Sequence, residues 1–215
     1  MSGTEASFEQ SSWLVGGAVV LAAYVIGCFS TGYYLVRFRT GLDLRALGTG
    51  SCGARNAGRV LGSNGFALTL AGDLAKGGLA VWIAQRVTGD DRTVLFALMA
   101  VVAGHVWPAQ LGFNGGKGIA TSLAGLLLYD CWLTGVYLLL FGALFSLTRR
   151  SVASSLGAYA LLPLVSYISK QDVSHVTGIA VLASFILVAH HQNIVAGARF
   201  LTGRRSLVQS EANYE

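Results

Sequence analysis

The run IATSLAGLLLYDCWLTGVYLLLFGALFSL, residues 119–147, contains one charged side chain, that of Asp130. A helix crosses the hydrocarbon core of a bilayer with about 20 mostly apolar residues, so this run is too long for one comfortable span. A single helix would also place the aspartate deep in the membrane, where a charge is costly. We therefore predict two membrane helices that meet near Tyr129 and Asp130.

The composition of the whole chain also indicates a membrane protein. Of the 215 residues, 53% are hydrophobic and 12% are charged, whereas soluble domains carry about 25% charged residues. A soluble domain of this length has too little interior for so many apolar side chains, so the surplus must face lipid. We expect an all-α polytopic membrane protein.

Further spans are predicted from the other apolar runs. The first begins at Trp13 and is preceded by Glu5 and Glu9, not by the basic cluster of a cleavable signal peptide. Arg37 and Arg39 follow it, which predicts a retained membrane segment. Besides the two spans in 119–147, the predicted spans are residues 13–36, 64–85, 93–111, 152–168 and 176–194.

Lysine and arginine gather in alternate connections between these spans. Residues 37–63, 112–118, 148–151 and 195–215 hold eleven of the 15 basic residues. Cytoplasmic loops carry such an excess, so we predict a bundle of about seven helices with the N-terminus outside and the C-terminus in the cytoplasm. Fusing 119–147 into one bent span would give six helices and fit the charges less well. Charge confined to loops does not indicate a nucleic-acid-binding face.

A glycine-rich cluster, GTGSCGARNAGR at residues 48–59, follows the first span. Its start matches GxGxxG, but no strand precedes it and no βαβ unit fits between two membrane spans, so a dinucleotide fold is excluded. Successive glycines still let backbone N–H groups converge on an anion, and arginine binds phosphate with paired hydrogen bonds. The alternative is a flexible basic loop that touches anionic lipid.

A second cluster, NGGKG at residues 114–118, precedes the helix predicted to begin at Ile119. It is not a Walker A loop, because the spacing is wrong and Gly118 stands where that motif has Ser or Thr. The glycines, the ammonium group of Lys117 and a helix N-terminus together favour an anion site. A tight turn between helices is the alternative.

Polar residues also occur within or at the ends of the spans. His190, His191, Gln192 and Asn193 close the last one, where such residues are usually functional or hydrogen-bonded in the bundle. A metal site is not expected, because adjacent histidines on a helix diverge and no carboxylate is near. His105, alone at the end of the third span, is interpreted as structural.

Asp73 and Lys76 stand three residues apart and share a helix face. One possibility is that the two charges form a buried structural pair. The alternative is that Lys76 faces the site and also binds phosphate. The cysteines Cys28, Cys52 and Cys131 have no paired spacing, so they predict buried structural thiols, not a zinc site or a disulfide framework. Only Cys52, which lies in the glycine-rich cluster, stays open as a functional residue.

These clusters resemble the signatures of the bacterial membrane acyl-phosphate:glycerol-3-phosphate acyltransferases, the PlsY family. The signatures are GSGNxGATNxxR, DxxKG, GGKGxAT and HxxNIxR, and they correspond here to residues 48–59, 73–77, 115–121 and 190–194 onward. Their order and spacing match, so the resemblance covers nearly the whole chain. It implies one transmembrane acyltransferase domain over residues 1–205, followed by a short polar cytoplasmic tail over 206–215.

The chain departs from these signatures at several positions. Thr49 replaces a serine and retains its hydroxyl, Ser51 replaces an asparagine, and Arg55 replaces a threonine and adds a positive charge. In the last motif Ala196 stands where the family has arginine. Arg199 restores that arginine if three residues are inserted, and Arg205 stands where the family has glutamate.

The resemblance implies transfer of a fatty acyl group from acyl phosphate to the sn-1 hydroxyl of glycerol 3-phosphate, giving lysophosphatidic acid and phosphate. It implies no cofactor and no metal, a bacterial inner-membrane location with the site facing the cytoplasm, and an acyl-phosphate-producing enzyme as a candidate partner beside membrane lipids. The alternatives are a same-fold enzyme with another polar acceptor, a transporter of a phosphorylated solute, and an inactive paralogue that binds without turnover.

The expected roles follow the motifs. Lys117 and the 115–118 backbone hold the glycerol phosphate, Arg59, Thr49 and the 48–53 backbone hold the acyl phosphate, and His190 and Asn193 orient the hydroxyl. The catalytic set is therefore Thr49, Arg59, Lys117, His190 and Asn193. The substrate-binding set is Gly48, Gly50, Ser51, Gly53, Asn56, Lys76, Gly115, Gly116, Gly118 and Thr121.

Overall fold

The computed structural model describes residues 3–169 and 171–195, and every regular element in those residues is helical. The remaining residues, which include Ala196, Arg199 and Arg205, lie outside the described part. The helices are α1 (Gly3–Cys28), α2 (Thr31–Thr40), α3 (Ala54–Thr88), α4 (Asp91–Val106), α5 (Ile119–Tyr129), α6 (Cys131–Thr148), α7 (Ser151–Ile168) and α8 (Val173–Ala189), with 3₁₀ turns at Leu44–Ala46 and Ala109–Leu111.

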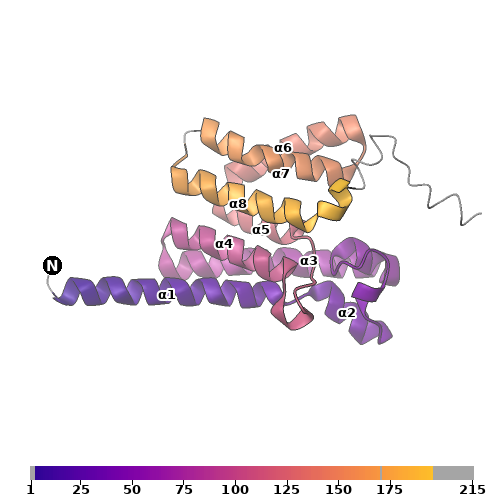
Figure 1. The fold of residues 1–215 in the computed structure, drawn as a ribbon, viewed down its shortest axis with the longest axis horizontal. Coiled ribbons are helices and arrows are strands. Elements are labelled where there is room, and N and C mark those ends of the chain that lie inside the picture. Colours follow the sequence, from indigo (N-terminus) through magenta and orange to yellow (C-terminus); the bar gives the residue numbers. More distant parts are fainter. Residues whose placement is uncertain (1–2, 170, 196–215) are drawn as a thin grey trace, which may run out of the picture.

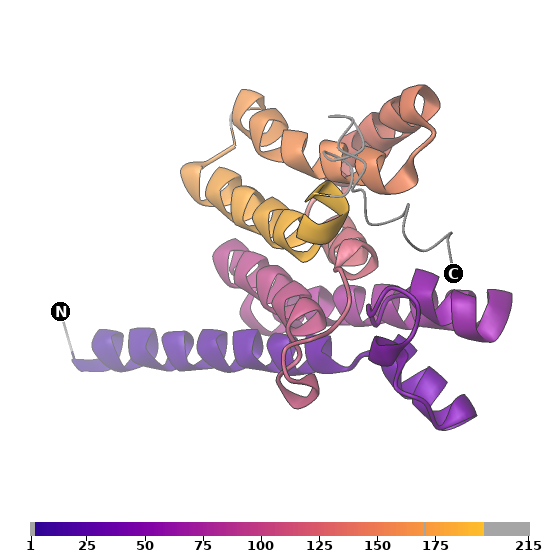
Figure 2. The same cartoon turned by 45° about the vertical axis from the view of Figure 1, so that its right-hand side comes forward.

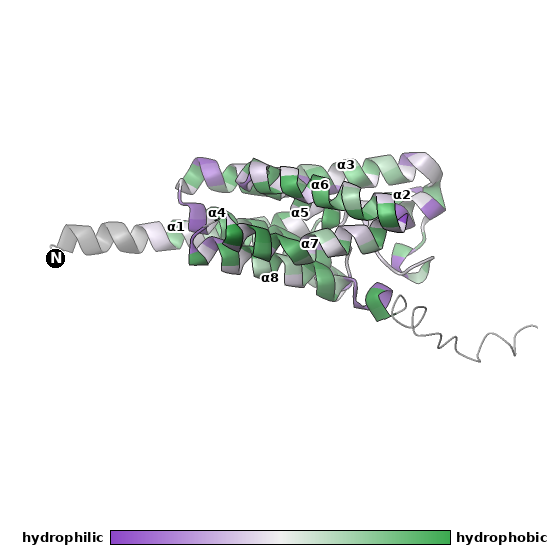
Figure 3. Ribbon diagram, turned by 90° about the horizontal axis from the view of Figure 1, so that it is seen from above, coloured by the Kyte–Doolittle hydropathy of each residue, from purple (hydrophilic) through white to green (hydrophobic). Residues whose placement is uncertain are grey.

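The long helices run back and forth with their axes close to parallel, so the connections gather at two ends (Figure 1). α1, α3 and α4 pack together on one side, α6, α7 and α8 form a second layer, and α5 lies between them (Figure 2). Hydrophobic residues cover the helices along their length, and hydrophilic ones concentrate near the turns (Figure 3). Large apolar side chains are exposed on this outer surface, such as Trp13, Leu139 and Leu147, as expected for contact with lipid.

Among the described residues, five segments are long and apolar enough to cross a membrane, and α5 and α8 are shorter apolar helices. The prediction of an all-α membrane protein is confirmed. α5 has 11 residues and is about 16 Å long at 1.5 Å per residue, which is short of a full span. The number of crossings and the sides on which the two termini lie stay predictions.

The predicted division of residues 119–147 is confirmed. α5 ends at Tyr129 and α6 begins at Cys131, and the carboxylate of Asp130 caps α6 by accepting a hydrogen bond from Leu133 N at 2.8 Å. The same carboxylate lies 3.3 Å from His175 Nε2 at the start of α8. The only charge of the run is therefore at an end of the bundle and not in its middle.

The expected continuous helix over residues 13–36 is interrupted, which corrects that prediction. α1 ends at Cys28 and α2 begins at Thr31. The interruption frees backbone carbonyls: Phe29 O accepts a hydrogen bond from Lys76 Nζ at 2.8 Å, and Cys28 O accepts one from Gln110 Nε2. A buried ammonium group needs such acceptors, and the break supplies one at Phe29.

The second predicted span, 64–85, is part of a longer helix with a kink. α3 begins at Ala54 and has non-helical dihedrals at Gly62, with φ 69° and ψ −159°. A residue with a Cβ would be strained there, so glycine permits the change of direction. The first part of α3, before Gly62, carries Arg55 and Arg59, and the second part crosses the bundle.

Candidate active site

The three clusters identified in the sequence meet at one end of the bundle, on the right of Figure 1. Cys52 N donates to Gly115 O at 3.1 Å, which joins the first cluster to the second. Lys117 Nζ donates to Asn193 Oδ1 at 2.6 Å, which joins the second to the third. The turn between α6 and α7 reaches the same end, where Arg55 Nη2 donates to Ser151 Oγ at 2.8 Å. Three of the four segments with basic residues that the sequence assigns to one side, 37–63, 112–118 and 148–151, are therefore neighbours; the fourth lies almost wholly outside the described residues.

The first cluster forms a loop around the buried side chain of Asn56. Its Nδ2 donates to the carbonyls of Leu44, Leu47 and Ser51 at 2.9–3.1 Å, and its Oδ1 accepts from Thr49 N at 3.0 Å. The amide therefore shapes the loop, and the prediction that it binds substrate stays untested. Thr49 is exposed at the tip of the loop.

The glycines of this loop have clear local roles. Gly48 and Gly50 have positive φ values, 56° and 71°, and a Cβ on Gly48 would lie 2.2 Å from Asn56 Oδ1. Gly53 is the N-terminal cap residue of α3, and its N–H donates to Ser51 Oγ at 3.3 Å. The glycine pattern read from the sequence thus reflects a tight loop that leads directly into a helix.

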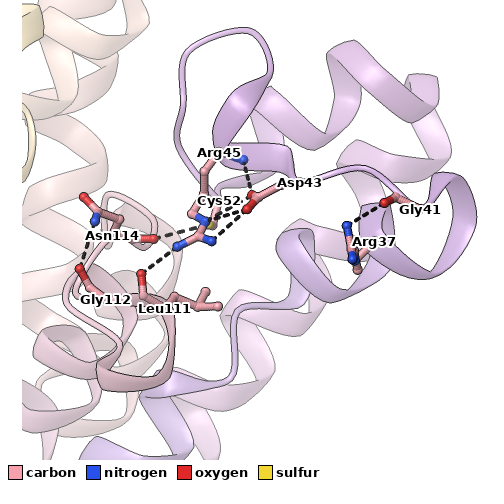
Figure 4. A network of polar contacts seen from close by, with 8 residues as sticks. All are labelled: Arg37, Gly41, Asp43, Arg45, Cys52, Leu111, Gly112 and Asn114. Atoms are coloured by element: carbon pink, nitrogen blue, oxygen red, sulfur yellow. Dashed lines mark hydrogen bonds and ion pairs between the residues drawn. The ribbon is translucent and has the colours of Figure 1, made fainter.

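Arg45, just before this loop, connects it to the turn Ala109–Leu111 that precedes the second cluster (Figure 4). Its guanidinium forms a two-pronged pair with Asp43, at 3.0 Å and 2.7 Å, and donates through Nη1 to Leu111 O at 2.7 Å. Hydrogen bonds from Arg45 lower the pKa of the Asp43 carboxyl. No local sequence pattern predicts this role of Arg45, because its acceptor, Leu111 O, is a backbone atom that lies 66 positions away.

Two of the three cysteines are buried, as predicted. Cys28 and Cys52 are buried, but Cys131 is exposed at the start of α6, so the prediction of a buried thiol was wrong there. Burial raises the pKa of the Cys52 thiol to about 11. A protonated, buried thiol is a poor nucleophile, and Cys52 is therefore a packing residue whose Sγ lies 3.6 Å from Asn114 O.

The second cluster packs tightly against the end of α4. Gly115 N donates to Val106 O at 3.1 Å, and Gly116 N donates to His105 O at 3.0 Å. These two N–H groups already donate hydrogen bonds and are not available to a phosphate. The groups that remain available for phosphate binding are the Lys117 side chain and the N–H groups of the first turn of α5, which have no acceptor within the helix. Gly118 caps α5 with φ 82°.

Alanine at Gly116 is expected to lower activity at least about tenfold and to reduce thermal stability. A Cβ there would lie 2.0 Å from His105 Nε2 and 2.5 Å from Cε1, and a clash with a fully packed ring moves the loop that carries Lys117. Turnover and the unfolding temperature in detergent measure the effect. Gly135→Ala is the matched control, since nothing lies within 4 Å of a Cβ at that position. Equal behaviour of the two variants would contradict the packing argument.

Lys117 is half-buried beside Asn193, and burial and then the charge of Arg55 lower its pKa from the usual lysine value. His190 is buried at the end of α8 and donates through Nδ1 to Ile186 O at 2.8 Å. A carbonyl can only accept, so Nε2 of the neutral ring is an acceptor. The site thus contains one ammonium donor and one neutral imidazole acceptor.

A wide-open cavity of about 410 Å³, closer to a surface depression than to an enclosed pocket, lies beside the kink in α3, and all of its lining residues belong to that helix. Arg55 and Arg59 lie one helical turn apart on its wall, and Phe66 lies on the second part of the helix. In the described part of the chain, no carboxylate forms an ion pair with either arginine. The remaining lining residues are Gly58, Gly62 and Ser63.

Lys76 lies in the interior, away from this cavity. Its Nζ is 2.9 Å from Asp73 Oδ1 and donates to Phe29 O, and the side chain is 5% exposed. His105 Nδ1 lies 3.5 Å from the same carboxylate oxygen. This geometry favours a structural pair over a phosphate ligand. Thr121, also predicted to bind substrate, is fully buried where α5 packs against Gly77 of α3.

Comparison with known proteins identifies the same family that the motifs indicate. The family model described as glycerol-3-phosphate acyltransferase matches residues 17–199. The chain is 45% identical over 176 residues to glycerol-3-phosphate acyltransferase 1 of Desulfitobacterium hafniense (strain Y51), covering 82% of this chain and 87% of that protein. It is 36% identical over 177 residues to the glycerol-3-phosphate acyltransferase of Syntrophomonas wolfei, covering 82% and 90% of the two chains.

The fold is also similar to a solved structure. The crystal structure of PlsY (YgiH), an integral membrane glycerol 3-phosphate acyltransferase in its glycerol 3-phosphate form, superposes with a TM-score of 0.77 and 28% identity. The match covers 93% of this chain and 99% of the crystallised one. The resemblance inferred from the motifs is therefore confirmed, and the chain belongs to the glycerol-3-phosphate acyltransferase family.

Proposed function

We propose that this protein transfers a fatty acyl group from acyl phosphate to the sn-1 hydroxyl of glycerol 3-phosphate. The hydroxyl oxygen forms a bond to the acyl carbon, the bond from that carbon to the phosphate oxygen breaks, and the hydroxyl proton ends on the released phosphate. The products are lysophosphatidic acid and inorganic phosphate. Because the donor is already activated, no covalent enzyme intermediate is needed, and positioning with charge stabilisation can supply the rate.

The observation that carries this proposal is the junction of Lys117 with Asn193 at the end of the bundle where Arg55 and Arg59 line a cavity. The ammonium group of Lys117 would hold the phosphate of glycerol 3-phosphate. Arg59, Thr49 and the 48–53 loop would hold the donor phosphate and the developing oxyanion. The Nε2 acceptor of His190 and the Asn193 amide would orient the attacking hydroxyl.

The test is turnover by purified protein supplied with palmitoyl phosphate and glycerol 3-phosphate. Release of phosphate and formation of lysophosphatidic acid should each require both substrates, and palmitoyl coenzyme A should not replace the donor. Equal rates with the coenzyme A ester would overturn the donor assignment. A screen with other polyol phosphates tests the alternative acceptor that the replacements at Ser51 and Arg55 allow.

The rate is expected to fall at high pH, starting below the usual pKa of lysine. Binding of glycerol phosphate needs protonated Lys117, whose pKa is lowered by burial and by Arg55. Arg55→Thr removes a positive charge that repels the ammonium group of Lys117, so the pKa of Lys117 rises. The alkaline limb of kcat/KM for glycerol 3-phosphate should therefore shift to higher pH. A shift to lower pH, or none, would contradict this sign.

The bacterial inner membrane is the proposed location, with the active site facing the cytoplasm. Cys131 provides a natural probe, because it is exposed and the other two cysteines are buried. An impermeant maleimide should label Cys131 in intact spheroplasts, and Cys131→Ser should abolish the signal. A cysteine at the exposed position Phe113, near the site end, should react only after permeabilisation. The reverse pattern would invert the topology.

A further inference from the structure

We propose that Arg55 is a second ligand for the phosphate of the acyl donor, beside Arg59, and that it makes this chain select donors with a terminal dianionic phosphate. The inference rests on the proposed function and extends it to a residue that the family signature does not contain. Threonine stands at this position in the signature, so a site built around Arg55 departs from that signature.

The first support is the placement of the two arginines. Arg55 and Arg59 are one turn apart on the first part of α3, so their side chains share a helix face, and both line the 410 Å³ cavity. Two guanidinium groups on one wall repel each other, and no carboxylate of the described residues neutralises them. A phosphate with two negative charges satisfies both and accepts paired hydrogen bonds from each.

The second support is the chemistry of the remaining wall. Ser63 adds a hydroxyl donor, and Phe66, which is 41% exposed, adds an apolar surface beyond the kink at Gly62. An anionic head beside an apolar wall fits an amphiphile such as acyl phosphate better than it fits a small polar ion. Exposure of Phe66 on a membrane helix gives the acyl chain a path toward lipid.

The third support is the position of Arg55 between the two substrates. Its Nη2 donates to Ser151 Oγ at 2.8 Å on the turn between α6 and α7, which uses one of its five N–H groups and leaves the others for a ligand. After burial, the charge of Arg55 is the second cause that lowers the pKa of Lys117. Arg55 therefore lines the cavity and also lies within electrostatic reach of Lys117 in the proposed glycerol phosphate site.

A purely structural role for Arg55 is the competing explanation, since the bond to Ser151 joins α3 to the turn between α6 and α7. The two roles differ in what Ser151→Ala does. That variant removes the hydrogen bond but keeps the guanidinium group. If Arg55 acts as a fastening, Ser151→Ala reproduces the effect of Arg55→Thr; if Arg55 binds the donor, it does not.

The experiment measures binding without turnover, so that it stays separate from the test of the proposed function. Hexadecylphosphonate, which has a dianionic head and an unreactive chain, is titrated calorimetrically into protein in neutral detergent. Arg55→Thr should weaken binding at least about tenfold, as expected for loss of charge-assisted hydrogen bonds. Arg55→Lys should recover part of the loss, and hexadecyl sulfate, with one charge, should bind less tightly and depend less on Arg55.

Two controls separate the proposal from its rivals. Arg39→Thr removes another exposed charge from the same end of the molecule and should change the affinity less than threefold, as should Ser151→Ala. In turnover assays Arg55→Thr should raise the KM for acyl phosphate and leave the KM for glycerol 3-phosphate within about threefold at pH 7, since one phosphate contact is lost and not the other.

Three results would overturn the inference. These are equal losses in Arg55→Thr and Arg39→Thr, a Ser151→Ala variant that behaves like Arg55→Thr, and full displacement of hexadecylphosphonate by phosphatidylglycerol in nanodiscs at equal mole fraction. The last would assign the arginines to membrane lipid. Phosphonate binding that depends on Arg55 in a protein without turnover would retain the anion site and reject the proposed reaction.

Discussion

Replacement of Lys117 by alanine is expected to lower kcat/KM for glycerol 3-phosphate by about 10²–10³-fold, the range measured when a single donor is removed from a preorganised oxyanion site. The ammonium group is half-buried at the start of α5 and held by Asn193 Oδ1 at 2.6 Å. Partial burial strengthens its attraction for a phosphate relative to the same charge in water. No other lysine lies in the described loops of this end.

The variant should remain folded, because removing Lys117 leaves the neutral amide of Asn193 and no buried opposite charge. The unfolding temperature and the binding of hexadecylphosphonate are the controls, and both should change little. Lys117→Arg keeps the charge but places it at a different distance, so partial activity is expected. Full activity of Lys117→Ala, with an unchanged dependence on glycerol 3-phosphate, would remove Lys117 from the acceptor site.

The sequence predicted the membrane fold well because the signal is physical and local. A bilayer requires long apolar segments, and an isolated charge such as Asp130 marks where such a segment must end. Basic residues gather in alternate loops between the predicted spans, and this pattern predicted that the motifs of the first two clusters lie on one side of the membrane. The hydrogen bond from Cys52 N to Gly115 O confirms that these two clusters are neighbours. These features depend on composition and order, not on detailed packing.

Features that depend on individual contacts could not be predicted. The break at Phe29 exists because its carbonyl meets Lys76, 47 positions later, and no local pattern encodes that meeting. The same is true of Arg45, which binds a backbone atom, and of Asn56, whose amide holds a loop together. The N–H groups of Gly115 and Gly116 looked available in the sequence, and packing against α4 occupies them.

Breaking the buried ion pair of Asp73 and Lys76 is expected to cause a large loss of stability. Asp73→Asn and Lys76→Met should each destabilise the protein by about 3–5 kcal/mol, the cost of leaving one buried charge without its partner. Asp73 and Lys76 are 3% and 5% exposed, and their charged groups are 2.9 Å apart. Unfolding temperature in detergent and the yield of folded protein measure the loss. Single variants as stable as the natural chain would show that water or a rearrangement solvates the remaining charge.

The double variant Asp73→Asn with Lys76→Met distinguishes the two roles that the sequence left open. It removes both charges, so no uncompensated ion remains and most of the lost stability should return. A structural pair requires nothing more, and activity should return with stability. If Lys76 instead binds a substrate phosphate, the double variant will fold and remain inactive. The contacts of Lys76 with Phe29 O and Asp73 favour the first outcome. An ammonium group shared between a carbonyl and a carboxylate has little attraction left for a ligand outside, and Lys76 is not among the residues that line the arginine cavity.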